Sequence, residues 1–301
     1  MTTLKLEHVH KSYGDLHAVN DLSLSVNEGQ IFGLLGPNGA GKTTTIRMIM
    51  DIIKPDAGRI EILGEHNPKK IRDRIGYLPE ERGLYKKMLV REVIQFFAEI
   101  KGVTKSVVQD KAYDWLERLD LIEWKEKKVE ELSRGMQQKL QFICTLLHEP
   151  RVIILDEPFT GLDPVNTDVM KDVILDQKKN GATIIFSTHL MDQVEKMCEA
   201  ICLINKGIAV LQGSLSEVKS RFGKNRVKLQ FEGKADFLND SALVASYDEY
   251  NQYVELTPAA GVKPNQLLER AIQTATVQRF EISEPSLNEI FKTMVKKGDE
   301  A

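Results

Sequence analysis

Hydrophobic residues change their spacing along this chain of 301 residues, and each spacing predicts a different kind of structure. Up to about residue 82, short stretches such as "LKLEHV" and "LSLSV" alternate between apolar and polar positions, which predicts strands. From about 88 to 148, apolar residues recur every three or four positions, which predicts helices. Beyond residue 150, "VIILDEP" (152–158) and "TIIFSTH" (183–189) are continuous apolar runs, typical of central parallel strands. An α/β fold with a helical insertion follows from these patterns.

Two segments predict helices, one between the two continuous runs and one before them. The segment "NTDVMKDVILDQKKN" between them supplies the helix that a right-handed crossover requires. In "VREVIQFFAEI" one helical stripe is formed by Val90, Val93, Ile94, Phe97 and Ile100.

A third region begins near residue 215. "RVKLQFEG" alternates cleanly, further strands are expected near 242–247 and 252–257, and a helix starts at Pro264. After the strand "TVQRFEI", a last helix begins with a capping box of Ser286 and Glu289. We expect that helix to bury Leu287, Ile290, Phe291, Met294 and Val295. The predicted domains are therefore 1–214, with a helical subdomain at about 88–148, and a small α+β domain over 215–301.

Composition and charge narrow the class of protein. With 42% apolar and 28% charged residues, the chain has the composition of a soluble globular protein. Its net charge of −3 gives no bulk attraction to nucleic acid, and it has no apolar run of about eighteen residues. We expect a cytoplasmic protein whose membrane role, if it has one, comes through a partner. Cys198 and Cys202 lack a second pair or a histidine nearby, so we interpret them as buried thiols.

A phosphate-binding loop follows an apolar strand. "GLLGPNGAGKTTT" (33–45) fits G-x-x-x-x-G-K-[ST] and leads into a helix, the context that this motif needs. Its backbone N–H groups and the helix dipole favour a phosphate. We expect Lys42 to reach the β- and γ-phosphates, Thr43 to offer its hydroxyl to Mg²⁺, and Thr44 to bind the α-phosphate. The nucleotide-binding residues of this loop are Gly36, Pro37, Asn38, Gly39, Ala40, Gly41, Lys42, Thr43 and Thr44.

Two carboxylates end the run "IILDEP". Buried unpaired carboxylates cost several kcal/mol, and the carboxyl end of a strand is where α/β sheets place their chemistry. We expect Asp156 to hold Mg²⁺ through a water and Glu157 to polarise an attacking water. The residues alone therefore predict Mg²⁺-dependent hydrolysis of a nucleotide.

Seven motifs occur together in a fixed order over about residues 1–214. They are "SYG" (12–14), "GPNGAGKTT" (36–44), "YLPEE" (77–81), "LSRGMQQK" (132–139), "IILDEP" (153–158), "GLD" (161–163) and "STH" (187–189). This set resembles the ATP-binding cassette (ABC) ATPases, a family of P-loop NTPases. The resemblance implies a mixed sheet core with an N-terminal antiparallel β subdomain and a helical subdomain. It also implies ATP as the nucleotide.

The family's roles carry over by position. Two cassettes of this family stack head to tail, so Ser133 and Gly135 would contact the ATP held by the other copy. The resemblance implies that Tyr13 stacks on the adenine, although a surface tyrosine at a strand end fits the same pattern. His189 would contact the γ-phosphate and the catalytic carboxylate, and Asp163 would cross the dimer interface. The catalytic set is then Glu157, His189 and Lys42, and the metal set is Thr43, Glu80 and Asp156.

Two positions depart from the family pattern. Arg134 and Met136 replace a glycine and the glutamine of the usual Leu-Ser-Gly-Gly-Gln, and we expect Arg134 to face solvent. Glu80 stands where the family has a glutamine that touches Mg²⁺ and the attacking water. A carboxylate can still bind the metal but adds negative charge beside a triphosphate. These departures keep open a pseudo-ATPase that binds ATP as a scaffold or regulator.

The resemblance also implies partners. An integral membrane permease would dock in a groove walled by Leu84, Tyr85 and Met88, and the cassette would pair with itself or with a closely related second cassette. We therefore expect the ATP-binding subunit of a bacterial exporter-type transporter, held at the inner face of the membrane, without a nucleic-acid partner. The alternatives are a soluble ABC ATPase acting on ribosomes or DNA, and a P-loop kinase for a small molecule. The C-terminal domain fits either a regulatory or a stabilising role.

Overall fold

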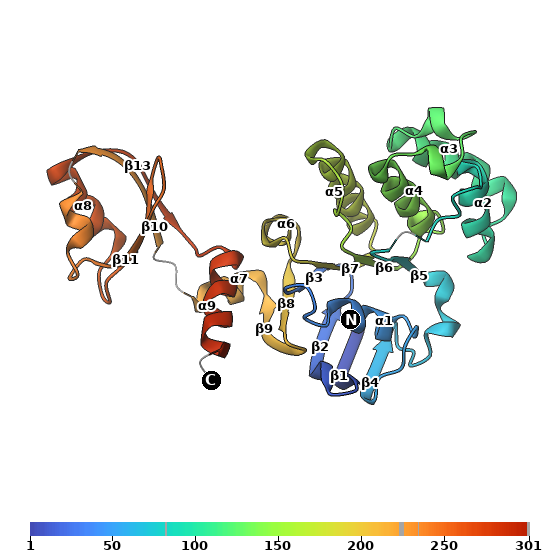
Figure 1. The fold of residues 1–301 in the computed structure, drawn as a ribbon, viewed down its shortest axis with the longest axis horizontal. Helices are drawn as coiled ribbons and strands as arrows, with labels where there is room; N and C mark the ends of the chain where they lie inside the picture. The colour runs from blue at the N-terminus through green and yellow to red at the C-terminus, as the bar shows by residue number, and fades with distance from the viewer. Residues whose placement is uncertain (82, 223–225, 234, 300–301) are drawn as a thin grey trace. The chain divides into compact units, whose positions relative to one another are not determined.

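The protein folds into two compact units, Met1–Ser214 and Leu215–Ala301 (Figure 1). The structure, a computed structural model, describes residues 1–299 except 82, 223–225 and 234, and it leaves out the side chains of 68 and 295–299. Among the described residues, none of the helices combines the length and the apolar character needed to span a bilayer. The first unit contains two sheets and the second contains one, and each unit has its own core.

A six-stranded sheet forms the centre of the first unit. Its order is β5-β6-β7-β3-β8-β9, parallel except for the antiparallel edge strand β9. The strands are β3 (Ile31–Leu35), β5 (Ile75–Leu78), β6 (Val152–Asp156), β7 (Thr183–Thr188), β8 (Ala200–Asn205) and β9 (Ile208–Ser214). Every residue of β3, β6 and β7 is buried, because both faces of these central strands are covered. The predicted parallel strands are therefore confirmed.

An antiparallel sheet of order β2-β1-β4 packs below the central sheet in Figure 1. Its strands are β1 (Thr2–Tyr13), β2 (Leu16–Asn27) and β4 (Ala57–Ile62). Leu4 and Leu6 of β1 share one hydrophobic cluster with Phe32 and Leu34 of β3 and with Ile46 of the first helix. This shared core fixes the hairpin β1–β2 against the loop that follows β3.

Helices cover both faces of the central sheet. Figure 1 shows α4 and α5 on one face, and α1 with the antiparallel sheet on the other. The helices of this unit are α1 (Lys42–Ile49), α2 (Val90–Ile100), α3 (Lys105–Arg118), α4 (Arg134–Leu146), α5 (Pro164–Lys179) and α6 (Met191–Met197). Short 3₁₀ turns complete it: η1 (Pro68–Lys70), η2 (Arg72–Arg74), η3 (Ile122–Trp124) and η4 (Val129–Glu131).

The apolar stripe of α2 is only partly buried. Val90, Val93 and Ile94 are buried, Phe97 is half-buried, and Ile100 is 63% exposed. Ile100 is exposed because the last turn of α2 borders an open groove instead of the core. A periodic pattern identifies one face of a helix but not how far along that face the neighbouring elements extend.

The second unit has a four-stranded antiparallel sheet of order β11-β12-β10-β13. Its strands are β10 (Arg226–Gly233), β11 (Val244–Glu249), β12 (Val254–Pro258) and β13 (Ala275–Ser283), and its helices are α7 (Leu215–Arg221), η5 (Asp236–Asn239), α8 (Pro264–Thr274) and α9 (Leu287–Asp299). Ser286 and Glu289 make both hydrogen bonds of the predicted capping box. In α9, Leu287 and Ile290 are buried, Phe291 and Met294 are half-buried, and the side chain of Val295 lies outside the described residues.

Candidate active site

Two positions of the loop between β3 and α1 have room for glycine alone. At Gly36 a Cβ atom would lie 2.2 Å from the backbone oxygen of Ile204, and at Gly41 it would lie 2.3 Å from that of Ala18. Gly41 also has a φ of +106°, a conformation that other residues avoid. The loop is thus pressed against its neighbours, and its backbone N–H groups and the start of α1 form an anion site.

A buried lysine closes this loop. The Lys42 ammonium donates to the carbonyl oxygens of Gly36 at 2.8 Å and Pro37 at 3.1 Å, and its side chain is only 6% exposed. Its nearest carboxylate oxygen is Oε1 of Glu157, 3.7 Å away. A buried cation at the mouth of an anion-binding loop is suited to the terminal phosphates of a nucleotide.

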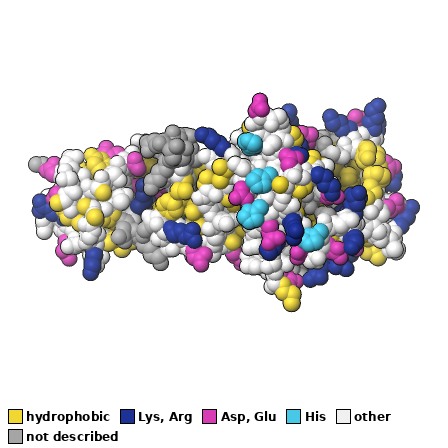
Figure 2. All heavy atoms as spheres, turned by 90° about the horizontal axis from the view of Figure 1, so that it is seen from below, with side chains coloured by type: hydrophobic (Ala, Val, Ile, Leu, Met, Phe, Trp, Pro, Cys, Tyr) yellow, Lys and Arg dark blue, Asp and Glu magenta, His cyan; other side chains and the backbone are white. Residues whose placement is uncertain are grey.

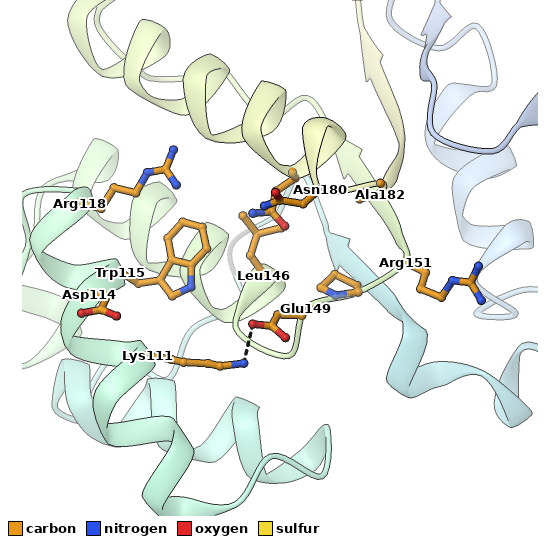
Figure 3. Close-up of a pocket in the computed structure, with 12 residues that line it drawn as sticks. Lys111, Asp114, Trp115, Arg118, Leu146, Glu149, Arg151, Asn180 and Ala182 are labelled. Carbon is orange, nitrogen blue, oxygen red and sulfur yellow. Dashed lines mark ion pairs between the residues drawn. The ribbon is translucent and has the colours of Figure 1, made fainter.

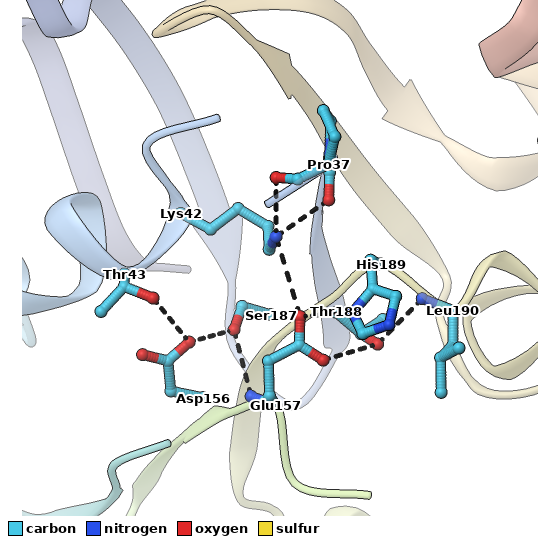
Figure 4. Close-up of polar contacts among 10 residues, drawn as sticks. Pro37, Lys42, Thr43, Asp156, Glu157, Ser187, Thr188, His189 and Leu190 are labelled. Atoms are coloured by element: carbon cyan, nitrogen blue, oxygen red, sulfur yellow. Dashed lines mark hydrogen bonds and ion pairs between the residues drawn. The ribbon is translucent and has the colours of Figure 1, made fainter. Parts of the chain in front are cut away.

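Asp156 ends β6 beside the first turn of α1 (Figure 4). Its Oδ1 accepts hydrogen bonds from the hydroxyls of Ser187 and of Thr43, the latter at 3.4 Å. Burial raises the pKa of the Asp156 carboxyl, and the two hydroxyl donors oppose that effect. Its Oδ2 is buried and has no hydrogen-bond partner among the described residues. A carboxylate that lies beside the Thr43 hydroxyl and has one unpartnered oxygen fits a hard cation such as Mg²⁺.

Glu157 adopts a left-handed backbone conformation, with a φ of +49°. This turn aims its carboxylate away from that of Asp156 and toward Lys42 (Figure 4). Its Oε2 accepts from the Thr188 hydroxyl at 3.3 Å, and its Oε1 lies 3.0 Å from Nδ1 of His189. An ionised carboxylate only accepts, so Nδ1 of His189 is the donor in that contact. Glu157 is therefore held in one orientation by groups from a neighbouring strand.

A cavity of about 540 Å³ joins the loop to the hairpin β1–β2. It is lined by Tyr13, Leu16, Ala18, Asn38, Gly39, Ala40, Gly41, Lys42, Thr43, Thr44, Glu80 and Glu157. Tyr13 is 50% exposed and Leu16 is 67% exposed, and the two residues face each other across the hairpin. Such exposed apolar surface beside the phosphate loop fits a nucleotide base. Leu16 was missed by the sequence analysis, although it is the cross-strand partner of the tyrosine.

Several predicted site residues do not line this cavity, and Ser133, Gly135 and Asp163 lie at the starts of two helices. Ser133 and Asp163 are the exposed N-caps of α4 and α5, where their side chains accept from the backbone N–H groups of Met136 and Asn166. The N–H donors lower the pKa of Asp163. Gly135 lies in the first turn of α4. In a single copy these residues have local roles only, and the start of α4 faces solvent.

Buried polar side chains connect the site to its surroundings and were not assigned from the sequence. Gln138 donates to the carbonyl of Pro158 at 3.2 Å, and Gln141 donates to that of Pro79 at 3.4 Å. Thus α4 is tied both to the loop after β6 and to the loop that carries Glu80. The signal was two glutamines on the buried side of a helix, which require hydrogen-bond partners.

Two family models of known proteins match separate parts of the chain. A family model described as "ABC transporter" matches residues 19–160. A second model, "ATP-binding protein DrrA1-3-like, C-terminal domain", matches residues 213–295. The first includes the phosphate loop, Asp156 and Glu157, and the second includes the sheet of the second unit.

Individual proteins match over most of the chain. An uncharacterized ABC transporter ATP-binding protein, YhaQ of Bacillus subtilis, is 43% identical over 288 residues, which are 96% of this chain and 97% of that protein. The Nod factor export ATP-binding protein I of Burkholderia orbicola is 34% identical over 250 residues, 82% of each chain. A solved structure described as the ATP-binding subunit of an ABC transporter superposes with a TM-score of 0.69 at 29% identity, covering 73% of this chain and 93% of that one.

Proposed function

This chain belongs to the ABC transporter ATP-binding proteins and is an ATP-hydrolysing subunit, and from that premise we propose which residues do the work and what they drive. The proposal is that two copies enclose ATP between them and that their closure moves a membrane-embedded permease, in the direction of export. The observation that carries it is the buried set of Lys42, Asp156 and Glu157 around one phosphate loop, with His189 in contact with Glu157. Removal of the Glu157 carboxylate, which should stop turnover and leave ATP binding intact, tests it directly.

In one copy, the residues around the cavity bind the nucleotide. Tyr13 and Leu16 contact the base, and the loop N–H groups and Lys42 hold the phosphates. Asp156, Thr43 and Glu80 are the residues that would hold Mg²⁺, which when bound neutralises phosphate charge and polarises the transferring group. The unpartnered Oδ2 of Asp156 supports this assignment. Glu80 and Thr43 support it because both line the cavity beside the phosphate loop.

Glu157 and His189 orient the attacking water. The Glu157 carboxylate accepts a proton from that water, or holds it in line, while His189 and Thr188 keep the carboxylate in place. His189 is 46% exposed, so its ring is accessible to the γ-phosphate as well as to Glu157. This geometry favours hydrolysis over a scaffold that only binds ATP. A small-molecule kinase would need an added acceptor, so turnover by the protein with ATP alone distinguishes the two.

The second copy would complete the site from outside. Ser133 and Arg134 are exposed, as the prediction that Arg134 faces solvent requires. Val165, just after Asp163, is 74% exposed, and an apolar side chain on this face suits a surface that a partner covers. Ser133 and Gly135 of each copy would then donate to the γ-phosphate held by the other, while Asp163 contacts the opposite cassette.

Gly135→Ala is expected to impair the site formed between two copies without destabilising the single copy. No backbone strain demands glycine there, and an added Cβ would meet Leu162 at an ordinary 3.5 Å. Stability should therefore stay level or rise by up to about 1 kcal/mol. Turnover should fall by about 10²-fold, because a methyl group would push the partner's phosphate out of position. Thermal unfolding and phosphate release measure the two effects.

Gly41→Ala is the contrasting variant, since its Cβ would collide with Ala18 within the same chain. It should lose both stability and turnover. Equal turnover in Gly135→Ala and the wild-type protein would contradict a phosphate contact at this position.

A second cavity, of about 380 Å³, would receive the permease. The described residues that line it are mostly apolar. They include three basic side chains, Arg72, Lys101 and His148, and no carboxylate. Burial lowers the pKa of His148 to about 4, so the positive charge comes from Arg72 and Lys101. Leu84 lines this groove. The other two residues predicted for the groove wall, Tyr85 and Met88, are not part of the lining. Tyr85 instead packs edge-on against Phe96, with ring centroids 5.2 Å apart. The groove is suited to an apolar helix that carries an acidic residue.

Ile100→Glu is expected to uncouple the subunit from its permease. Ile100 lines the groove and is 63% exposed, so the change adds a charge where an apolar helix would dock and leaves the core intact. Basal ATP turnover should be unchanged, and affinity for the co-expressed membrane protein of the neighbouring gene should fall by about tenfold. Val107→Glu on α3, 41% exposed and outside the groove lining, is the matched control. Equal loss in both variants would contradict the docking site.

The direction of transport and the place of action are supported by relatives. A Nod factor export protein is similar over 82% of this chain, and a DrrA-like domain follows the cassette. We propose that the pair lies at the cytoplasmic face of the membrane, held there by the permease. A soluble ABC ATPase on ribosomes or DNA would instead co-purify with nucleic acid, and the chain's net charge of −3 does not favour that partner.

A further inference from the structure

Two adjacent hydroxyls on β7 contact two adjacent carboxylates on the end of β6 (Figure 4). Ser187 bonds Asp156, and Thr188 bonds Glu157. The register of the two parallel strands pairs Asp156 with Ser187, so the contact is fixed by the sheet. None of these four residues is more than 7% exposed, so water does not compete for the hydrogen bonds.

The direction of the Ser187 hydrogen bonds follows from their chemistry. The hydroxyl has one proton, which it donates to Oδ1 of Asp156, an acceptor. Its oxygen accepts from the backbone N–H of Glu157 at 3.2 Å. One side chain therefore fixes the carboxylate of the first residue and the backbone turn of the second.

A hydroxyl with a purely structural role has a different environment. Thr183, at the other end of β7, accepts from the backbone N–H of Gly29 at 2.9 Å and pairs with the hydroxyl of Thr3 at 3.3 Å. No carboxylate takes part in those contacts. At Asp156, by contrast, one carboxylate oxygen is occupied by hydroxyls and the other is buried without a partner among the described residues.

We propose that Ser187 is a positioning residue for the metal ion, because its hydrogen bond to Oδ1 holds the Asp156 carboxylate in one orientation beside the Thr43 hydroxyl. The inference rests on the proposed metal role of Asp156. Groups that orient a metal ligand commonly alter metal affinity by about 10–100-fold when they are removed. Ser187 also ties that ligand to the backbone of Glu157, so the metal site and the catalytic carboxylate keep a fixed relation.

Mn²⁺ binding, followed by the electron paramagnetic resonance signal of the free ion with ADP present, tests this directly. Ser187→Ala should weaken Mn²⁺ binding by about tenfold. Nucleotide binding in EDTA should be unchanged, which also shows that the variant is folded. Ser187→Cys keeps the size with a weaker donor, and its Mn²⁺ affinity should lie between those of the wild-type protein and Ser187→Ala. Thr183→Val removes a buried hydroxyl from the same strand and should leave Mn²⁺ binding unaltered.

Asp156→Asn distinguishes a failure of the role given to Ser187 from a failure of the metal role given to Asp156. If Asp156→Asn loses Mn²⁺ while Ser187→Ala binds it as the wild-type protein does, the role of Ser187 is wrong and the metal assignment stands. Wild-type Mn²⁺ affinity in Asp156→Asn overturns both. An equal loss in Thr183→Val would show that any buried hydroxyl of β7 matters, and it would also overturn the role of Ser187.

Discussion

Glu157→Gln should lower ATP turnover by about 10³-fold while ATP still binds. The amide keeps the shape of the side chain and can still accept from Thr188, but it no longer accepts a proton from the attacking water. It also loses the negative charge that lies 3.7 Å from the Lys42 ammonium. With hydrolysis blocked, the ATP-bound pair should accumulate. Phosphate release, equilibrium dialysis with ATP and light scattering measure turnover, binding and the dimer.

Glu80→Gln is the matched control for that experiment. It makes the same change to another carboxylate that lines the cavity, and it restores the residue usual in the family. Turnover should stay within about tenfold of the wild-type rate, since Glu80 is assigned to metal binding and not to the proton. Wild-type turnover in Glu157→Gln would remove Glu157 from catalysis and leave the scaffold hypothesis as the better one.

Mixed pairs of two inactive variants should regain activity. Lys42→Ala removes the phosphate-binding ammonium, and Ser133→Arg blocks the start of α4. Each variant alone should retain less than about 1% of the turnover, because every site in its homodimer has one damaged half. In a mixed dimer, one site combines the intact loop of one chain with the intact α4 of the other.

Co-expression of the two variants, purified without separating the dimers, gives the mixture for measurement. Random pairing makes about half of the dimers mixed, each with one intact site of two, so about a quarter of the wild-type rate should return. Lys42→Ala paired with the double variant Lys42→Ala, Ser133→Arg has no intact site and should stay inactive. Recovery in neither mixture, or full activity of Ser133→Arg alone, would mean that each chain owns a complete site.

Local chemistry explains why much of the site could be predicted. A phosphate loop needs glycine at sterically closed positions and a lysine at one fixed distance along the chain, so Gly36, Gly41 and Lys42 are visible in the sequence. Central parallel strands need continuous apolar runs, which identified β6 and β7 and hence the place of Asp156 and Glu157. In each case the residues that determine the feature are close together in the chain.

Contacts between distant segments were decided only by the tertiary structure. The Ser187 hydroxyl reaches Asp156 because β6 and β7 pair in one register, 31 residues apart. Leu16 lines the cavity beside the phosphate loop because the hairpin packs on the loop after β3. Ile100 lies on the apolar stripe of α2 but beyond the packed core. The spacing of apolar residues does not indicate where the core ends along a helix. The sequence by itself determined which groups this protein offers to a nucleotide. The packing of its strands decided which oxygen of Asp156 remains free, because burial and hydrogen-bond partners depend on neighbours that the chain brings together only when it folds.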